Sequence, residues 1–172
     1  FFGACTRTDY PASINTAINK MWDTQADVLP PRTKVSLIAA ELSRRNYHGR
    51  AYAKSQNVRP TYIKAYDDAL ANVDLLVMPT CIMTAPKNHT PGSYLEAVEH
   101  NLASGNSGGS RNTMPFNYTG HPALALPVGK STAGLPVSMQ IVGRFFDDPL
   151  VMRAAYAYQQ STDWDKIIGV KT

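Results

Sequence analysis

Two cysteines, Cys5 and Cys81, are too few for a disulfide framework, and neither stands at a spacing typical of zinc ligands. No apolar run approaches the roughly 20 residues that cross a bilayer, so we expect no transmembrane helix. The four histidines are scattered, and no two lie at the helical spacing that would pair them as metal ligands. The chain also starts without a methionine or a basic leader. These absences indicate part of a longer cytoplasmic protein with neither metal nor cofactor.

The residues that are present suffice for a folded core, because 44% of the 172 residues are hydrophobic and 17% are charged. The net charge is +4, from 17 Lys and Arg against 13 Asp and Glu. Basic residues gather on one stretch, interleaved with Tyr47, Tyr52 and Tyr62: they are Arg32, Lys34, Arg44, Arg45, Arg50, Lys54, Arg59 and Lys64. Such a stretch could bind nucleic acid, but no nucleic-acid motif accompanies it, so we favour the solvated face of a helix.

Helical periodicity predicts one helix over 33–56, with Thr33 as its N-cap, and a second over 61–72. Pro60 is expected to separate them, because proline interrupts helical hydrogen bonding. A short helix should start at Gly92-Ser93, with Glu96 close behind, and run through about Leu102. A last helix should start at Asp147, with Asp148 and Pro149 in its first turn, and pack on the sheet.

Short apolar runs bounded by turn residues predict buried strands over 74–80, 122–127 and 135–142. A polar loop over 130–134 joins the last two strands, which we expect to pair as an antiparallel hairpin. The result is a mixed α/β layer structure. Three strands are few for so many helices, which indicates that partner strands are missing from this chain.

The glycine- and serine-rich stretch over 104–110 resembles a phosphate-binding loop only in composition. It lacks the Gly-Lys-Ser/Thr ending and follows no strand, so a flexible loop is the favoured interpretation. The G-x-S-x-G pattern of a nucleophile elbow is absent there as well. The histidines, among them His121, have no partner that the sequence identifies, and we expect them to be surface or hydrogen-bonded structural residues. The residues alone complete no catalytic constellation.

Four blocks of sequence carry a family resemblance: DLLVMPT at 74–80 followed by Ala85-Pro86, RNTMPFNYTGHPALALPVG at 111–129, GLPVSMQIVGR at 134–144, and YHGRAYAKSQN at 47–57. The first three, in this order, resemble the C-terminal portion of the amidase signature family. The fourth is similar to the nitrile-pathway acylamide amidases within that family. The resemblance covers nearly the whole chain from about residue 33.

The resemblance implies an acylamide amidohydrolase that converts a carboxamide to a carboxylate and ammonia with a Ser–Ser–Lys centre. The base Lys must be neutral to accept a proton, which requires a depressed pKa. The family's Gly-Gly-Ser-Ser signature and this Lys belong to its N-terminal and middle portions and are absent here. Gly108-Gly109-Ser110 is only superficially similar and lies where the family has no nucleophile. We therefore assign no catalytic residue and expect this chain alone to be inactive.

The resemblance also implies a larger mixed β-sheet flanked by helices, of which residues 1–172 would be a C-terminal fragment of one domain. Within it, 1–32 is poorly defined, 33–72 is helical and 73–160 carries strands and helices. The expected partners are a small-molecule amide and the missing N-terminal part, with neither membrane nor nucleic acid, and a homodimer stays open. The rival hypothesis is a non-catalytic α/β binding module that uses the basic helix.

We predict that Ser110, Thr113, Phe116 and Asn117 line or support the pocket for the substrate's acyl group, because loops that adjoin strand ends bind ligands in α/β folds. The segment 110–117 is expected to be a rigid, proline-containing loop. A turn held by side-chain hydrogen bonds is an equal alternative for Thr113 and Asn117. For Phe116, plain core packing is the stronger alternative.

Overall fold

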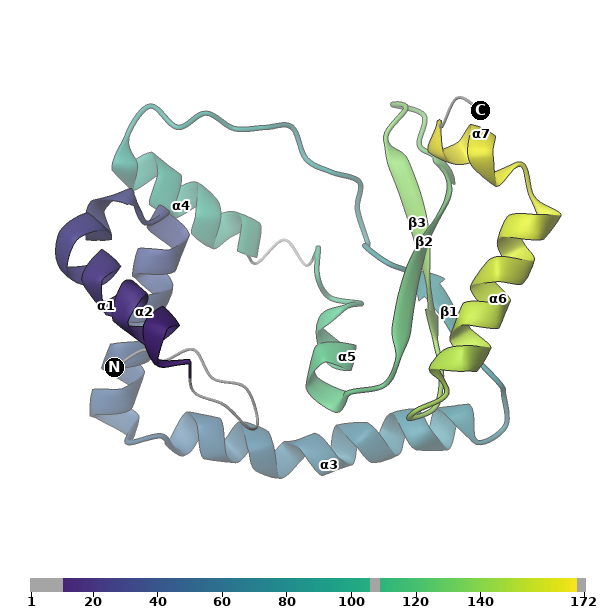
Figure 1. Ribbon diagram of the computed structural model, residues 1–172, viewed down its shortest axis with the longest axis horizontal. Coiled ribbons are helices and arrows are strands. Elements are labelled where there is room, and N and C mark those ends of the chain that lie inside the picture. The colour runs from purple at the N-terminus through teal and green to yellow at the C-terminus, as the bar shows by residue number, and fades with distance from the viewer. Residues whose placement is uncertain (1–10, 106–108, 170–172) are drawn as a thin grey trace. The chain divides into compact units, whose positions relative to one another are not determined.

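The computed structural model of the chain describes residues 11–105 and 109–169, and Figure 1 shows its helices and strands. The chain divides into two compact units. The first comprises Phe1–Asn46 and Pro91–Leu102, and the second comprises Tyr47–Thr90 and Ala103–Thr172. In the described part of the chain, no helix has the length and hydropathy needed to span a membrane.

Helices build the first unit: α1 (Ala12–Gln25), the 3₁₀ turn η1 (Ala26–Val28), α2 (Pro31–Tyr47) and most of α4 (Tyr94–Gly105). Helix α2 begins at Pro31, so Thr33 is not its N-cap as predicted. Proline suits the first turn of a helix, because its missing N–H would have no partner there. On the exposed side of α2, hydrogen bonds from Arg44 and then Arg45 lower the pKa of Glu41 to about 2.

The prediction of a single helix over 33–56 is wrong, because the helix ends at Tyr47. His48 and Gly49 take left-handed backbone angles, with φ of 49° and 80°. Glycine adopts this conformation at little cost, so α2 ends here and a separate helix, α3 (Arg50–Leu70), follows.

Pro60 lies inside α3 and does not end it, which corrects the predicted boundary. A proline in a helix interior costs about 3 kcal/mol. Contacts to Tyr118 on both sides of Pro60 offset this cost: Arg59 Nε donates to the Tyr118 carbonyl at 2.6 Å, and the Tyr118 hydroxyl donates to the Ser55 carbonyl. The ring of Tyr62 also meets that of Tyr118 edge-on at 5.7 Å. Tertiary contacts therefore keep the helix continuous.

The second unit contains a small antiparallel sheet of β1 (Leu76–Pro79), β2 (Ala123–Lys130) and β3 (Pro136–Val142), in the order β1-β3-β2. The predicted hairpin of β2 and β3 is confirmed. Burial is lower than predicted, because side chains alternate between half-buried and exposed along β1, where Val77 is 62% exposed. A strand at the edge of a sheet with one open face exposes every second side chain.

Helix α6 (Asp148–Ser161) packs on this sheet as predicted, and a further helix, α7 (Trp164–Ile168), follows it. The core consists of Leu126 and Ile141 from the hairpin with Val151 and Ala155 from α6. Asp147 takes the N-cap position, although its side chain makes no capping hydrogen bond. The observed fold is thus mixed α/β with a small antiparallel sheet, as expected.

Candidate functional site

The segment predicted as a rigid loop over 110–117 instead turns into a short helix, α5 (Met114–Thr119). Pro115 lies in the first turn, where its fixed φ suits a helix and its missing N–H costs nothing. Gly120 ends the helix with a left-handed φ of 92°. The proline that suggested a loop therefore marks a helix start.

A tight turn precedes α5, and it closes on the carbonyl of Ser110. This oxygen accepts hydrogen bonds from the backbone N–H groups of Thr113 at 3.0 Å and Met114 at 2.9 Å. The Thr113 hydroxyl donates to the same carbonyl at 3.1 Å. Three donors on one acceptor make 110–114 a stiff unit, and Thr113 contributes to it through its side chain.

Two side-chain amides fasten this turn to the sheet. Asn112 Nδ2 donates to the Pro79 carbonyl at the end of β1, at 2.7 Å. Gln140 Nε2, from the central strand β3, donates to the Asn112 carbonyl at 2.8 Å. Gln140 is only 3% exposed, and a buried amide requires such partners. We assigned Gln140 no role from the sequence, although a polar residue within a strand of apolar neighbours was a usable signal.

An open groove of about 940 Å³ lies beside the turn, within the second unit. Its lining comes from α3 and from 110–118: Ala51, Lys54, Ser55, Val58, Tyr62, Ser110, Arg111, Met114, Pro115 and Tyr118. Most of these groups are apolar, two are cationic and none is acidic. Of the four predicted site residues, Ser110 belongs to this lining.

The other three predicted residues are placed around the groove without forming its surface. Phe116 is 5% exposed, and its ring packs against Tyr66 at 5.1 Å between centroids. Thr113 is half-buried in the turn, and Asn117 is exposed on α5. Phe116 and Thr113 therefore support α5, as their alternative interpretations require, while Ser110 faces the groove.

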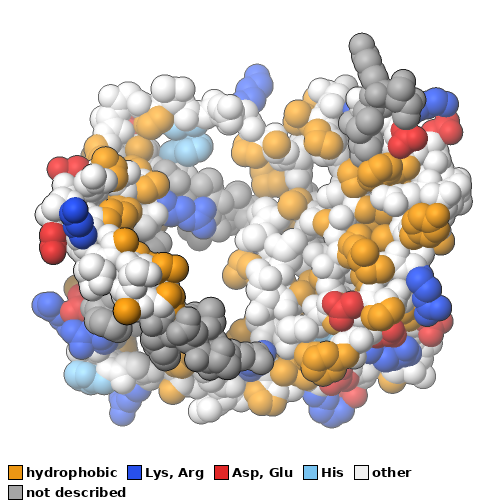
Figure 2. Space-filling view, viewed as in Figure 1, with side chains coloured by type: hydrophobic (Ala, Val, Ile, Leu, Met, Phe, Trp, Pro, Cys, Tyr) orange, Lys and Arg blue, Asp and Glu red, His pale blue; other side chains and the backbone are white. Residues whose placement is uncertain are grey.

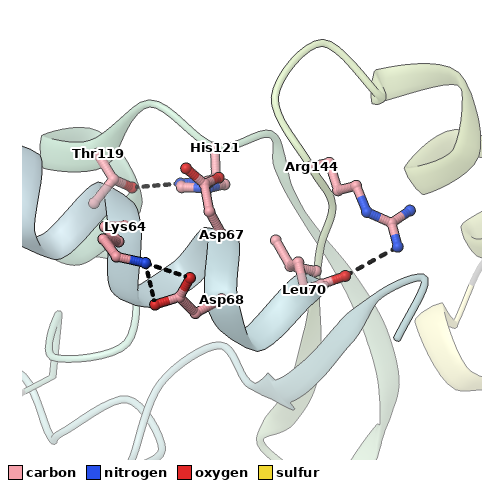
Figure 3. A network of polar contacts seen from close by, with 7 residues as sticks. All are labelled: Lys64, Asp67, Asp68, Leu70, Thr119, His121 and Arg144. Carbon is pink, nitrogen blue, oxygen red and sulfur yellow. Dashed lines mark hydrogen bonds and ion pairs between the residues drawn. The ribbon is translucent and has the colours of Figure 1, made fainter. Parts of the chain in front are cut away.

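A buried histidine follows α5, and Figure 3 shows its contacts. His121 Nδ1 lies 3.0 Å from the hydroxyl of Thr119, and its Nε2 lies 3.2 Å from Oδ1 of Asp67 on α3. This order resembles a hydrolytic triad. However, Thr119 and the His121 side chain are fully buried, so neither can reach a substrate. The prediction that His121 is a hydrogen-bonded structural residue is confirmed.

Arg144 fixes the other end of α3. Its guanidinium donates to the Leu70 carbonyl at 2.9 Å, as Figure 3 shows. It also donates to the Val73 carbonyl at 2.8 Å, where the chain runs from α3 toward β1. A cation at a helix C-terminus satisfies carbonyls that lack helical partners. Across the described residues, no group of three His, Cys, Asp or Glu side chains is arranged to hold a metal ion.

A protein-family model described as Amidase matches residues 3–152 of the 172. The chain belongs to the amidase family. This confirms the resemblance to the amidase signature enzymes, while the narrower likeness to nitrile-pathway amidases stays a prediction.

Named relatives agree with this membership. A glutamyl-tRNA(Gln) amidotransferase subunit of Methanosarcina barkeri is 40% identical over 118 residues, 69% of this chain and 23% of that protein. An uncharacterized protein in the nthA 5' region of Rhodococcus erythropolis is 35% identical over 135 residues, 78% of this chain and 65% of that protein. The crystal structure of the corresponding amidotransferase subunit of Thermotoga maritima is 28% identical with a TM-score of 0.51, over 71% of this chain and 25% of that one. The chain thus spans about a quarter of the amidotransferase subunits that it matches.

Several residues of the basic stretch are paired with acidic side chains or backbone carbonyls. Glu41 accepts hydrogen bonds from Arg44 and Arg45, and Asp68 accepts from Lys64. Arg59 is turned toward the backbone of α5. These residues also lie on two separate helices rather than on one. The arrangement supports the solvated face that we favoured.

Proposed function

We propose that this chain contributes the acyl-binding side of an amide hydrolase that converts a carboxamide to a carboxylate and ammonia. The observation that carries the proposal is the family match over 150 of its residues, from 3 to 152. Some relatives are named as amidotransferase subunits, but this chain matches only about a quarter of their length, so we do not extend an amide-transfer activity to it. Hydrolysis, with water as the acceptor, is the simplest reaction of an amidase.

The bond-breaking groups belong, in this proposal, to sequence outside this chain. The resemblance implies a Ser–Ser–Lys centre together with a Gly-Gly-Ser-Ser signature, and the 172 residues contain no such signature. They also correspond to only 23% of the Methanosarcina relative. The complete enzyme would supply a nucleophile, a neutral Lys base and backbone N–H groups that stabilise the oxyanion.

The groove beside the Ser110 turn is the proposed acyl site. Its apolar wall from Met114, Pro115 and Tyr118 would take up the hydrocarbon of the acyl group and exclude water from it. Ser110 adds one hydroxyl at the turn. Thr113 and Phe116 would act indirectly, by keeping the turn and α5 in place, and Asn117 would extend the exposed edge.

The compartment and the assembly follow as part of the same proposal. Cys81 is an exposed free thiol, which suits a reduced cytoplasm. The missing N-terminal part of the enzyme is the proposed partner of the exposed apolar side chains, and the homodimer stays a prediction. A weak affinity for nucleic acid that vanishes in moderate salt would not support binding through the basic stretch, because any protein with a charge of +4 shows some such affinity.

Turnover of a simple amide is the direct test. The complete enzyme should release ammonia and lose activity with a serine-directed inhibitor, whereas this chain alone should be silent. The chain alone should also bind an apolar dye, because Met114, Met152 and Tyr156 are each more than half exposed. Figure 2 shows such hydrophobic side chains over the part of the surface where α6 lies. Serine-inhibitor-sensitive turnover by the chain alone would contradict the proposal.

Acyl selectivity tests the assignment of the groove. Ser110→Leu should narrow it and lower kcat/KM for a bulky aromatic amide about tenfold more than for a small aliphatic amide. Phe116→Leu should mainly reduce stability, because that ring packs in the interior. Ser36→Leu, on the exposed side of α2, is a matched control that should change neither the acyl selectivity nor the stability. If Ser110→Leu alters stability alone, Ser110 does not line the acyl site.

A further inference from the structure

Beyond the groove itself, the structure shows how its Ser110 turn is held. The turn contacts two neighbouring strands through Asn112: its side chain bonds to the carbonyl of Pro79 in β1, and its carbonyl accepts from Gln140 in β3. Because β1 and β3 are hydrogen-bonded neighbours, with Met78 opposite Gln140, both anchors belong to one rigid sheet. The turn therefore has two fixed points.

The central position of Gln140 makes this anchor firm. Gln140 faces Met78 on one side and Ala125 on the other, so its backbone is fixed by both neighbouring strands. Alternate residues of a strand point to opposite faces, so Gln140 lies on the face away from Ile141 and the α6 core. The Gln140 side chain, which is 3% exposed on this face, donates a hydrogen bond to the Asn112 carbonyl.

The turn transmits this position to the groove because it moves as a unit. The Ser110 carbonyl accepts from three donors of Thr113 and Met114, so a shift at Asn112 cannot be absorbed within 110–114. Ser110 and Met114, at the two ends of this unit, both line the groove. Displacing Asn112 would change the width of the groove without removing any of its lining groups.

We propose that Asn112 and Gln140 are positioning residues that set the acyl selectivity of the enzyme by fixing the Ser110 turn to strands β1 and β3. This inference rests on the proposed function, since it assumes that the groove holds the acyl group. It differs from a simple structural role in what it predicts: the two residues control which amides are accepted as well as how stable the fold is.

The test uses the complete enzyme and two near-isosteric changes. Asn112→Asp replaces the Nδ2 donor by an oxygen that cannot donate to Pro79, and Gln140→Met keeps the length of the side chain but removes its donor. Asn57→Asp on α3 and Gln160→Met on α6 are matched controls at exposed positions. KM and kcat are measured for a bulky aromatic and a small aliphatic amide, together with the melting temperature.

Each variant should raise KM for the bulky amide about fivefold, the effect of losing one hydrogen bond, while KM for the small amide stays within about twofold. The double variant should resemble the single ones, because both residues act through one turn. An equal loss for both amides, in step with lower stability, would overturn the inference. If Gln140→Met does not fold, Asn112→Asp, at a half-buried position, decides alone. Absence of turnover in the unmodified enzyme would instead refute the proposed function.

Discussion

Replacing Gly143 by alanine should lower the free energy of unfolding by about 1–3 kcal/mol, the cost of overpacking a well-filled core. Gly143 is buried directly after β3, and a Cβ at this position would lie 2.7 Å from Cγ2 of Val151. It would also lie 3.5 Å from the Asp147 carbonyl and 3.6 Å from Cδ2 of Leu75. Val151 is β-branched and 2% exposed, so its side chain has little room to move aside.

Urea denaturation followed by circular dichroism measures the effect, and Gly129→Ala provides the control. Gly129 lies in β2, and a Cβ there would meet nothing within 4 Å. Its replacement should change stability by less than about 0.5 kcal/mol, as expected for a surface substitution. In a Val151→Ala background the close contact is gone, so the additional cost of Gly143→Ala should shrink. Equal effects at Gly143 and Gly129 would show that α6 does not pack closely on the end of β3.

The hairpin and α6 could be predicted from sequence because their signals are local. Apolar residues flank a turn at Gly134, and Asp147 with Pro149 marks the start of a helix whose apolar side meets the sheet. Each of these features is determined within a short stretch of chain. Only their depth of burial was overestimated, since burial depends on elements far away in sequence.

The wrong helix boundaries have the opposite origin. Nothing local distinguishes Pro60 from a helix-ending proline, and the contacts of Arg59 and Ser55 with Tyr118 bridge about 60 residues. The left-handed turn at His48 and Gly49 had a sequence signal, the glycine, but helical periodicity continued on both sides of it. Tertiary contacts overrode the propensity of a proline in one case, and a single glycine outweighed periodicity in the other.

The candidate site likewise contains residues that could be predicted from the sequence and residues that could not. Ser110 was predicted as a site residue because the loop that carries it adjoins a strand, and Ser110 belongs to the lining of the groove. The anchors of its turn could not be found in this way, because Asn112 and Gln140 are 28 residues apart and meet only once the sheet has formed. For Phe116, core packing was the stronger of the two interpretations that the sequence offered, and its contact with Tyr66 agrees with it.

His121→Leu should lower the free energy of unfolding by about 2–4 kcal/mol, the largest effect that we expect for a single polar residue of this chain. Leucine keeps much of the volume but leaves the fully buried hydroxyl of Thr119 without its partner. It also removes the ring that packs against Phe145 at 4.2 Å between centroids. The contact between α3 and the segment after α5 depends on this side chain.

A double-mutant cycle separates these contributions. Thr119→Val removes the hydroxyl that His121→Leu would leave unpaired, so the two changes together should cost less than their sum. Asp67→Asn should cost less than about 1 kcal/mol, because the Asp67 side chain is 51% exposed and water can replace the contact. Strict additivity of His121→Leu and Thr119→Val in urea denaturation would contradict the contact between the two side chains. A coupled pair would instead show that His121, which directly follows the short helix that carries Phe116, fastens the end of this helix to α3 while Asn112 fastens its leading turn to the sheet.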